Sequence, residues 1–171
     1  MHLVGRAVAA PESSRSCGPP RQVNGVVRRQ NMADVTITDV MKAYAQDAER
    51  LASKEGVSLD YTEKSLEGVD TILHQIAGDG VVPPNTPEQE EQLWMLAKVY
   101  GGYLGEVVIR NLGGAWEMAD NPDGSARVIL RCQGVQMFPL EKVYKRLAED
   151  QFSGVSGYCR ALRAIIARQG T

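Results

Sequence analysis

The sequence predicts an α+β domain in which helices pack on one face of a small three-stranded antiparallel sheet. Three observations predict this fold class. Apolar residues recur at steps of three and four before residue 113 and after residue 138, which is the period of amphipathic helices. Short strand-like segments separated by turn residues lie between these two regions. One middle helix is apolar on nearly every side, so we expect it to be long, central and buried.

Two amphipathic helices are expected ahead of the central one. The first runs from Thr38, which can cap it, to about residue 54, and Gly56 ends it. The second is capped by Thr62 and ends before Gly78. Their apolar stripes contain Ile37, Val40, Tyr44, Ala48 and Leu51 in the first helix and Leu66, Val69, Ile72, Leu73 and Ile76 in the second.

The central helix is predicted over residues 87–112. The segment Thr86–Gln89 is a capping box with proline at the first helical position, and Gly113 and Gly114 end the helix. Three glycines lie inside it, at Gly101, Gly102 and Gly105, and each costs up to ~1 kcal/mol relative to alanine. A flat strip of glycines lets a second backbone approach closely, so we expect tight packing there; a ligand lying on the strip is the alternative.

A three-stranded meander and two further helices complete the domain. The strands are expected at 115–118, 125–132 and 135–138, with a turn at 119–124 between the first two. Pro139 opens the fourth helix, and the fifth covers about 155–168.

Residues 1–31 differ in character from the rest of the 171-residue chain. They hold five arginines and one acid, for a charge of +4, together with scattered prolines and glycines and no helical or strand period. We expect a disordered tail or a mis-assigned start, with Met32 as the natural first residue; a transit peptide is the alternative. Residues 32–171 are then a single globular domain.

The charge and the cysteine content disfavour several classes of function. Residues 32–171 hold 14 basic and 20 acidic side chains, and this net charge of −6 disfavours binding of nucleic acid. Three cysteines, Cys17, Cys132 and Cys159, make an odd and widely spaced set. This set disfavours a disulfide framework or zinc site and favours a reducing, cytoplasmic location. No apolar run approaches the ~18 residues of a membrane span, so no membrane association is expected.

Two segments resemble motifs for catalysis or metal binding, but each lacks residues that the motif requires. Gly154–Tyr158 resembles a nucleophile elbow, but Tyr158 replaces the final glycine and no strand is predicted before it. The segment 119–130 resembles a calcium loop, but Ala119 and Leu130 hold its first and last ligand positions. We therefore predict no catalytic residue, no metal ligand and no cofactor.

The only histidine beyond residue 31 is His74, one helical turn after Asp70. A carboxylate–imidazole contact could orient a general base there. Since the sequence offers no nucleophile or metal partner, we expect a surface or half-buried structural histidine instead.

One polar group stands out in the apolar part of the central helix. Glu106 precedes Arg110 by four residues, the favourable order for a helical ion pair. A buried carboxylate must be paired or protonated, so we expect a structural salt bridge. The alternative is a ligand-binding pocket formed by Tyr103, Glu106, Arg110 and Trp116.

Several segments between residues 57 and 147 share one arrangement: a glycine-rich helix ending in Leu-Gly-Gly-x-Trp, a short sheet, and a Phe-Pro helix start. The segments are Leu59–Thr62, Tyr100–Glu106, Arg110–Trp116, Phe138–Pro139 and Val143–Arg146. This arrangement resembles an uncharacterised family of small bacterial domains of unknown function. The resemblance implies the fold and no activity. Some similar domains are immunity or accessory proteins beside secreted toxins, which suggests an analogous role.

The sequence therefore favours a non-catalytic cytoplasmic protein-interaction module, immunity-like or accessory, that binds a protein partner. Acidic residues gather near Glu88–Glu91 and at Glu149 and Asp150, which would suit a basic partner, although solvated helix ends explain them equally well. The alternative is a small-molecule-binding protein or enzyme with a pocket around Glu106 and Arg110.

Overall fold

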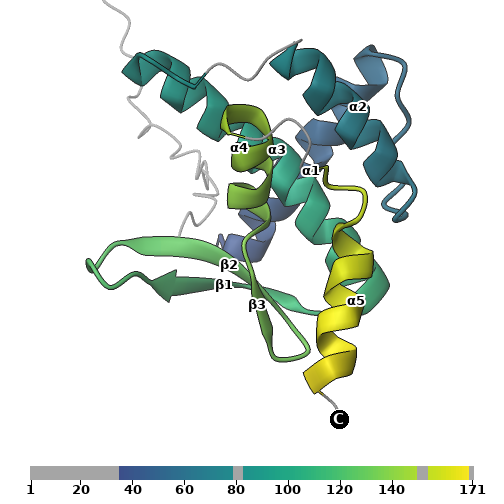
Figure 1. Ribbon diagram of the computed structural model, residues 1–171, viewed down its shortest axis with the longest axis vertical. Coiled ribbons are helices and arrows are strands. Elements are labelled where there is room, and N and C mark those ends of the chain that lie inside the picture. Colours follow the sequence, from purple (N-terminus) through teal and green to yellow (C-terminus); the bar gives the residue numbers. More distant parts are fainter. Residues whose placement is uncertain (1–34, 79–82, 150–153, 170–171) are drawn as a thin grey trace, which may run out of the picture. The chain divides into compact units, whose positions relative to one another are not determined.

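The computed structural model describes residues 35–78, 83–149 and 154–169 (Figure 1). The predicted tail at 1–31 lies outside the described residues. Five helices and three strands are present among the described residues, and they confirm the α+β class. They are α1 (Ile37–Lys54), α2 (Ser65–Ala77), α3 (Pro87–Leu112), β1 (Ala115–Asp120), β2 (Ala126–Cys132), β3 (Val135–Met137), α4 (Pro139–Ala148) and α5 (Tyr158–Gln169).

The three strands form an antiparallel meander in the order β1-β2-β3. Trp116 pairs with Leu130, and Leu130 pairs with Met137, so one row of side chains crosses all three strands. All three side chains are buried. Because side chains at paired positions lie on the same face of a sheet, this row fixes the face that covers the core.

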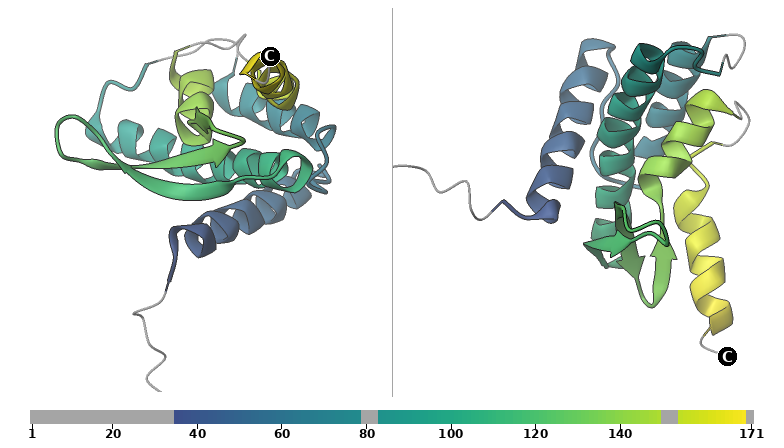
Figure 2. Two further views of the ribbon diagram at one scale, coloured as in Figure 1. Left: turned by 90° about the horizontal axis from the view of Figure 1, so that it is seen from below. Right: turned by 90° about the vertical axis from the view of Figure 1, so that its left-hand side faces the viewer.

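Helix α3 is the centre of the domain, as predicted. Thr86 caps it by accepting a hydrogen bond from the backbone N–H of Gln89, with Pro87 at the first helical position. The helix lies beside α1 and α4 (Figure 2) and also touches β2. Its residues from Tyr100 to Val108 are all buried, which is expected of a helix covered on every side.

The glycine strip of α3 makes tight packing contacts, as predicted. A Cβ atom at Gly101 would lie 2.7 Å from the Cα of Leu140 at the start of α4. At Gly102 it would lie 3.0 Å from the backbone oxygen of Met41 in α1. At Gly105 it would overlap the indole ring of Trp116. The three glycines therefore pack against three different neighbours, and the strip is covered by other parts of the protein instead of a ligand.

Two helix starts differ from the prediction. Helix α1 is capped by Thr36 and not by Thr38, because Thr36 and Asp39 form a reciprocal capping box. Helix α2 begins at Ser65 and not directly after Thr62. Tyr61 there has a left-handed backbone (φ 62°), and its N–H donates to the hydroxyl of Tyr103 at 2.8 Å.

Helix α5 also starts later than predicted, at Tyr158. The residues just before it are held by Asp70 of α2, which accepts hydrogen bonds from the backbone N–H groups of Val155 (2.6 Å) and Ser156 (2.9 Å). Further along, the guanidinium of Arg163 forms an ion pair with Glu63. The carboxylates of Glu63 and Asp70 thus fix the position of α5.

Of the helices in the described ranges, none combines the length and apolar character that crossing a membrane requires.

Candidate functional site

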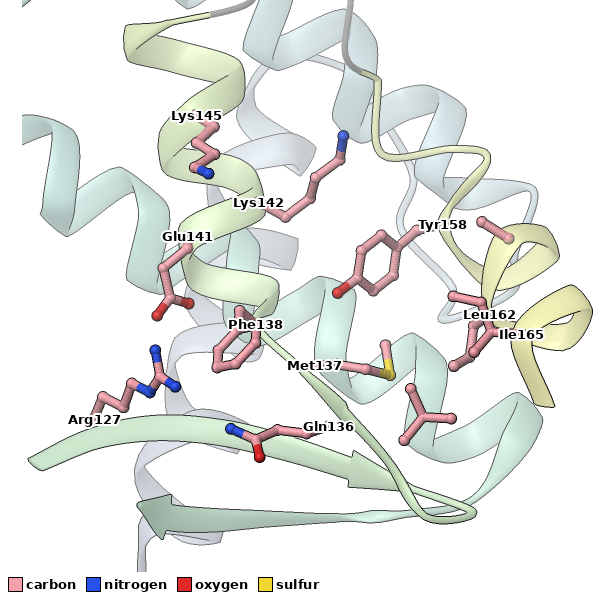
Figure 3. A pocket seen from close by; sticks show the side chains of 12 residues that line it. Arg127, Gln136, Met137, Phe138, Glu141, Lys142, Lys145, Tyr158, Leu162 and Ile165 are labelled. Atoms are coloured by element: carbon pink, nitrogen blue, oxygen red, sulfur yellow. The ribbon is translucent and has the colours of Figure 1, made fainter. Parts of the chain in front are cut away.

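An open cavity of about 470 Å³ lies among β2, β3, α4 and α5 (Figure 3), and we call it the α4–α5 pocket. One side is formed by α4 and the other by α5, with β3 below. These elements are held in place by the central helix and by the carboxylates that fix α5. The pocket is therefore built from segments that are separate along the chain.

The wall of the pocket near α5 is apolar. Met137 at the end of β3 and Leu162 of α5 are buried at its base, whereas Ile165, one turn further along α5, is 44% exposed. Figure 3 shows the ring of Tyr158 between α4 and α5, beside these aliphatic groups. A half-exposed isoleucine next to buried apolar groups is a surface that a further apolar group can cover.

The opposite side of the pocket is polar and mainly basic. Arg127 of β2 and the α4 residues Lys142 and Lys145 line it, together with one acid, Glu141. The guanidinium of Arg127 lies over the ring of Phe138, with 4.3 Å between its central carbon and the ring centroid. Such cation–π contacts hold a guanidinium near an apolar surface without neutralising it.

Two buried polar atoms of this side lack a hydrogen-bond partner within the described part of the chain: Nε of Arg127 and Oε2 of Glu141. Figure 3 shows the two side chains pointing toward one another. They form no ion pair within 4.0 Å among the described residues. Buried polar groups are normally hydrogen-bonded, so this corner of the pocket favours a bound group that supplies a donor or acceptor.

The charge of the chain is divided along the sequence in a way that matters for this pocket. Residues 126–171, which supply every residue that lines it, contain eight arginines and lysines and three acids. Residues 32–125 contain six basic and seventeen acidic side chains. The pocket therefore lies in the basic part of an otherwise acidic domain.

Burial holds two groups at and behind the pocket, the Tyr158 hydroxyl and the Cys159 thiol, in their neutral forms by raising their pKa values. Burial raises the pKa of Tyr158 to about 12, although a hydrogen bond with the Phe138 backbone acts in the opposite direction. Burial also raises the pKa of the Cys159 thiol to about 11. Because the thiolate is the reactive form of cysteine, Cys159 is a poor nucleophile near neutral pH.

The four residues predicted as a ligand site have protein partners instead of lining this pocket. Glu106 is 3% exposed and accepts a hydrogen bond from Nε1 of Trp116 at 3.0 Å. The hydroxyl of Tyr103 lies 2.6 Å from that of Ser65. Arg110 is exposed and lies over the ring of Tyr61, with its guanidinium carbon 3.3 Å from the centroid.

The predicted ion pair between Glu106 and Arg110 was wrong: the ion pairs of the described residues do not include it. A spacing of four residues permits the ion pair, but each of the two side chains contacts an aromatic residue instead. The Trp116 indole N–H satisfies the carboxylate, and the guanidinium stacks on Tyr61. A ligand-binding role for Tyr103, Glu106, Arg110 and Trp116 stays a prediction.

The other candidate groups are placed as structural residues. His74 is exposed, as expected, and Asp70 uses both carboxylate oxygens on the backbone before α5. Within the described ranges, no three histidine, cysteine or acidic side chains gather as a metal site would require.

Comparison of the chain with protein-family models, with curated proteins and with solved structures finds no match. The resemblance to small bacterial domains of unknown function therefore remains a prediction from the segments named above. The chemistry of the α4–α5 pocket is the main basis for assigning a function.

Proposed function

We propose that this chain is a non-catalytic protein-interaction module, immunity-like or accessory, that acts in the cytoplasm and binds its partner through the α4–α5 pocket. The observation that carries the proposal is the pocket itself. It joins an exposed apolar residue, Ile165, to buried apolar groups on one side and to lysines and Arg127 on the other. An apolar centre with a polar rim is the usual anatomy of a protein-binding surface.

The pKa values of Tyr158 and Cys159 support binding over catalysis by these two groups. A general acid or base works best when its pKa lies near the working pH, whereas burial moves the pKa of Tyr158 to about 12. The pKa of Cys159 is displaced in the same direction, to about 11. The buried free thiols of Cys132 and Cys159 also suit a reducing compartment.

The test is affinity capture from lysate of the source organism, with the full chain as bait. A matched pair of variants makes the test specific. Ile165→Glu places a charge in the pocket, and Met118→Glu places the same charge on β1, where Met118 is 54% exposed and lies outside the pocket. We expect one stoichiometric protein with the unchanged chain and with Met118→Glu, and its loss with Ile165→Glu. Equal capture by all three would refute binding through the pocket.

A small-molecule ligand is the second candidate, because a volume of about 470 Å³ lies within the range of small-molecule sites. A thermal-shift screen with metabolites separates the two predicted locations. A ligand of the α4–α5 pocket loses its effect in Ile165→Glu, whereas a ligand of the Glu106 and Arg110 region loses it in Glu106→Gln. Stabilisation that survives both substitutions would place the ligand elsewhere.

A further inference from the structure

We infer that the α4–α5 pocket recognises an acidic, amphipathic segment of a partner protein. The inference rests on the proposed function and adds the chemistry of the partner to it. Apolar side chains of the segment would cover Ile165 and the groups behind it. Its carboxylates would pair with the cations along α4 and β2. The net negative charge of the domain as a whole favours a basic partner. The charge of the pocket and the net charge of the domain therefore predict partners of opposite charge.

The apolar half of the recognition comes from α5. Leu162 and Met137 are 3% and 5% exposed, so they form a base for the pocket, while Ile165 is 44% exposed above it. Figure 3 shows the aliphatic side chains of Leu162 and Ile165 on the α5 side, facing the space beside Met137. An aliphatic wall suits the leucine or isoleucine side chains of a peptide.

The charged half of the recognition comes from α4 and β2. Three of the four charged residues that line the pocket are cationic: Arg127, Lys142 and Lys145. Further cations of α5 lie in the same basic part of the sequence, at Arg160 and Arg168, whereas Arg163 is paired with Glu63. A local excess of one sign attracts the opposite sign over several ångströms and selects partners by charge.

The unpartnered atoms of Arg127 and Glu141 would add a specific contact. Nε of Arg127 needs an acceptor, and Oε2 of Glu141 needs a donor. A peptide segment carries both in its backbone, and an acidic one adds carboxylate acceptors that an arginine fork binds well. Both atoms are buried, so the two side chains would have to turn toward the pocket to reach a docked segment.

The probe for this inference is a fluorescein-labelled helical peptide of roughly three to four turns, with leucines at i and i+4 and glutamates on the flanking positions. Two comparison peptides replace every glutamate by lysine, or both leucines by serine. Binding to the full chain is measured by fluorescence anisotropy at low and at moderate salt. We expect the acidic leucine peptide to bind at least about tenfold more tightly than either comparison peptide, and to weaken severalfold as salt rises.

Variants of the protein assign the binding to the pocket. Ile165→Glu and Lys145→Glu should each weaken the acidic peptide about tenfold or more. Met118→Glu carries the same added charge on β1 and should leave binding unchanged. Far-ultraviolet circular dichroism checks that each variant keeps its helices. Lys145 is exposed, so we expect its replacement to leave the fold intact and to keep the test valid if Ile165→Glu unfolds.

Several results would overturn the inference. Equal binding of the glutamate and lysine peptides would show that charge does not select the peptide. Equal binding of the acidic peptide by Met118→Glu and Ile165→Glu would show that it does not bind in the pocket. Tighter binding of a single-stranded oligonucleotide than of the acidic peptide would identify nucleic acid as the occupant. Self-association abolished by Ile165→Glu would identify a second copy of this chain. If affinity capture yields a partner with a basic contact segment, this inference fails while the proposed function stands; if no protein is captured through the pocket, the proposed function fails as well.

Discussion

Replacing Gly105 by alanine tests how the central helix is seated against the sheet. A Cβ atom at this position would overlap the six-membered ring of Trp116, whose side chain is 4% exposed. Overpacking of this kind costs up to about 3 kcal/mol, while alanine in place of glycine within a helix regains about 1 kcal/mol. The net expectation is a loss of about 2 kcal/mol in the free energy of unfolding.

Urea denaturation followed by tryptophan fluorescence measures this difference, and a thermal scan should show a midpoint lower by roughly 7 °C for a domain of this size. Gly157→Ala is the matched control, because a Cβ there would meet nothing within 4 Å. We expect it to change the free energy of unfolding by about 0.5 kcal/mol or less.

A double-mutant cycle makes the cause specific. Trp116→Phe removes the ring atoms that the new Cβ would overlap, so Gly105→Ala should cost at least about 1 kcal/mol less in that background. If Gly105→Ala is as stable as the Gly157→Ala control, the indole does not lie against Gly105. If the penalty is the same with phenylalanine at position 116, the strain arises elsewhere in the helix.

Three further predictions address other contacts. Trp116→Phe deprives the buried Glu106 carboxylate of its indole donor and should cost about 1–3 kcal/mol by urea denaturation, whereas Glu106→Gln retains an acceptor and should cost less; the reverse order would contradict the contact. Arg163→Ala removes the ion pair with Glu63 and should speed amide hydrogen exchange in α5 more than in α1; uniform exchange rates would contradict anchoring by this pair. The pKa of Cys159 is about 11 in the folded chain, above its ordinary value of 9.0. The unfolded chain therefore loses its thiol proton first as pH rises, so stability should fall between about pH 9 and 11, and less steeply in Cys159→Ala; identical pH slopes would contradict the burial effect.

The fold could be predicted because its main features are local in the sequence. The capping residues at Thr86–Gln89 and the glycines at 113 and 114 set the ends of α3 within a few positions. The start of α2 could not be predicted in the same way. It depends on a left-handed backbone at Tyr61, and this backbone is held by hydrogen bonds with Tyr103 and Asn111, more than forty residues away.

The candidate site depends even more on contacts that spacing along the sequence cannot predict. Spacing along one helix predicts an ion pair between Glu106 and Arg110, but it says nothing about the rings of Trp116 and Tyr61 that these two side chains contact instead. The α4–α5 pocket gathers residues from β2, β3, α4 and α5, and no spacing connects them. One sequence property does point to it: the excess of basic residues after position 126, which the net charge of the whole domain conceals.

The central claim is that the α4–α5 pocket is where this domain meets a protein partner. The most direct test is to place a photo-crosslinking amino acid at position 165, and in a separate chain at position 118, in cells of the source organism. Both side chains are about half exposed, and only residue 165 lines the pocket. We predict one cross-linked protein at position 165 and none at position 118, with the cross-linked peptide rich in aspartate and glutamate. No product at position 165, or the same products at both positions, would contradict the claim.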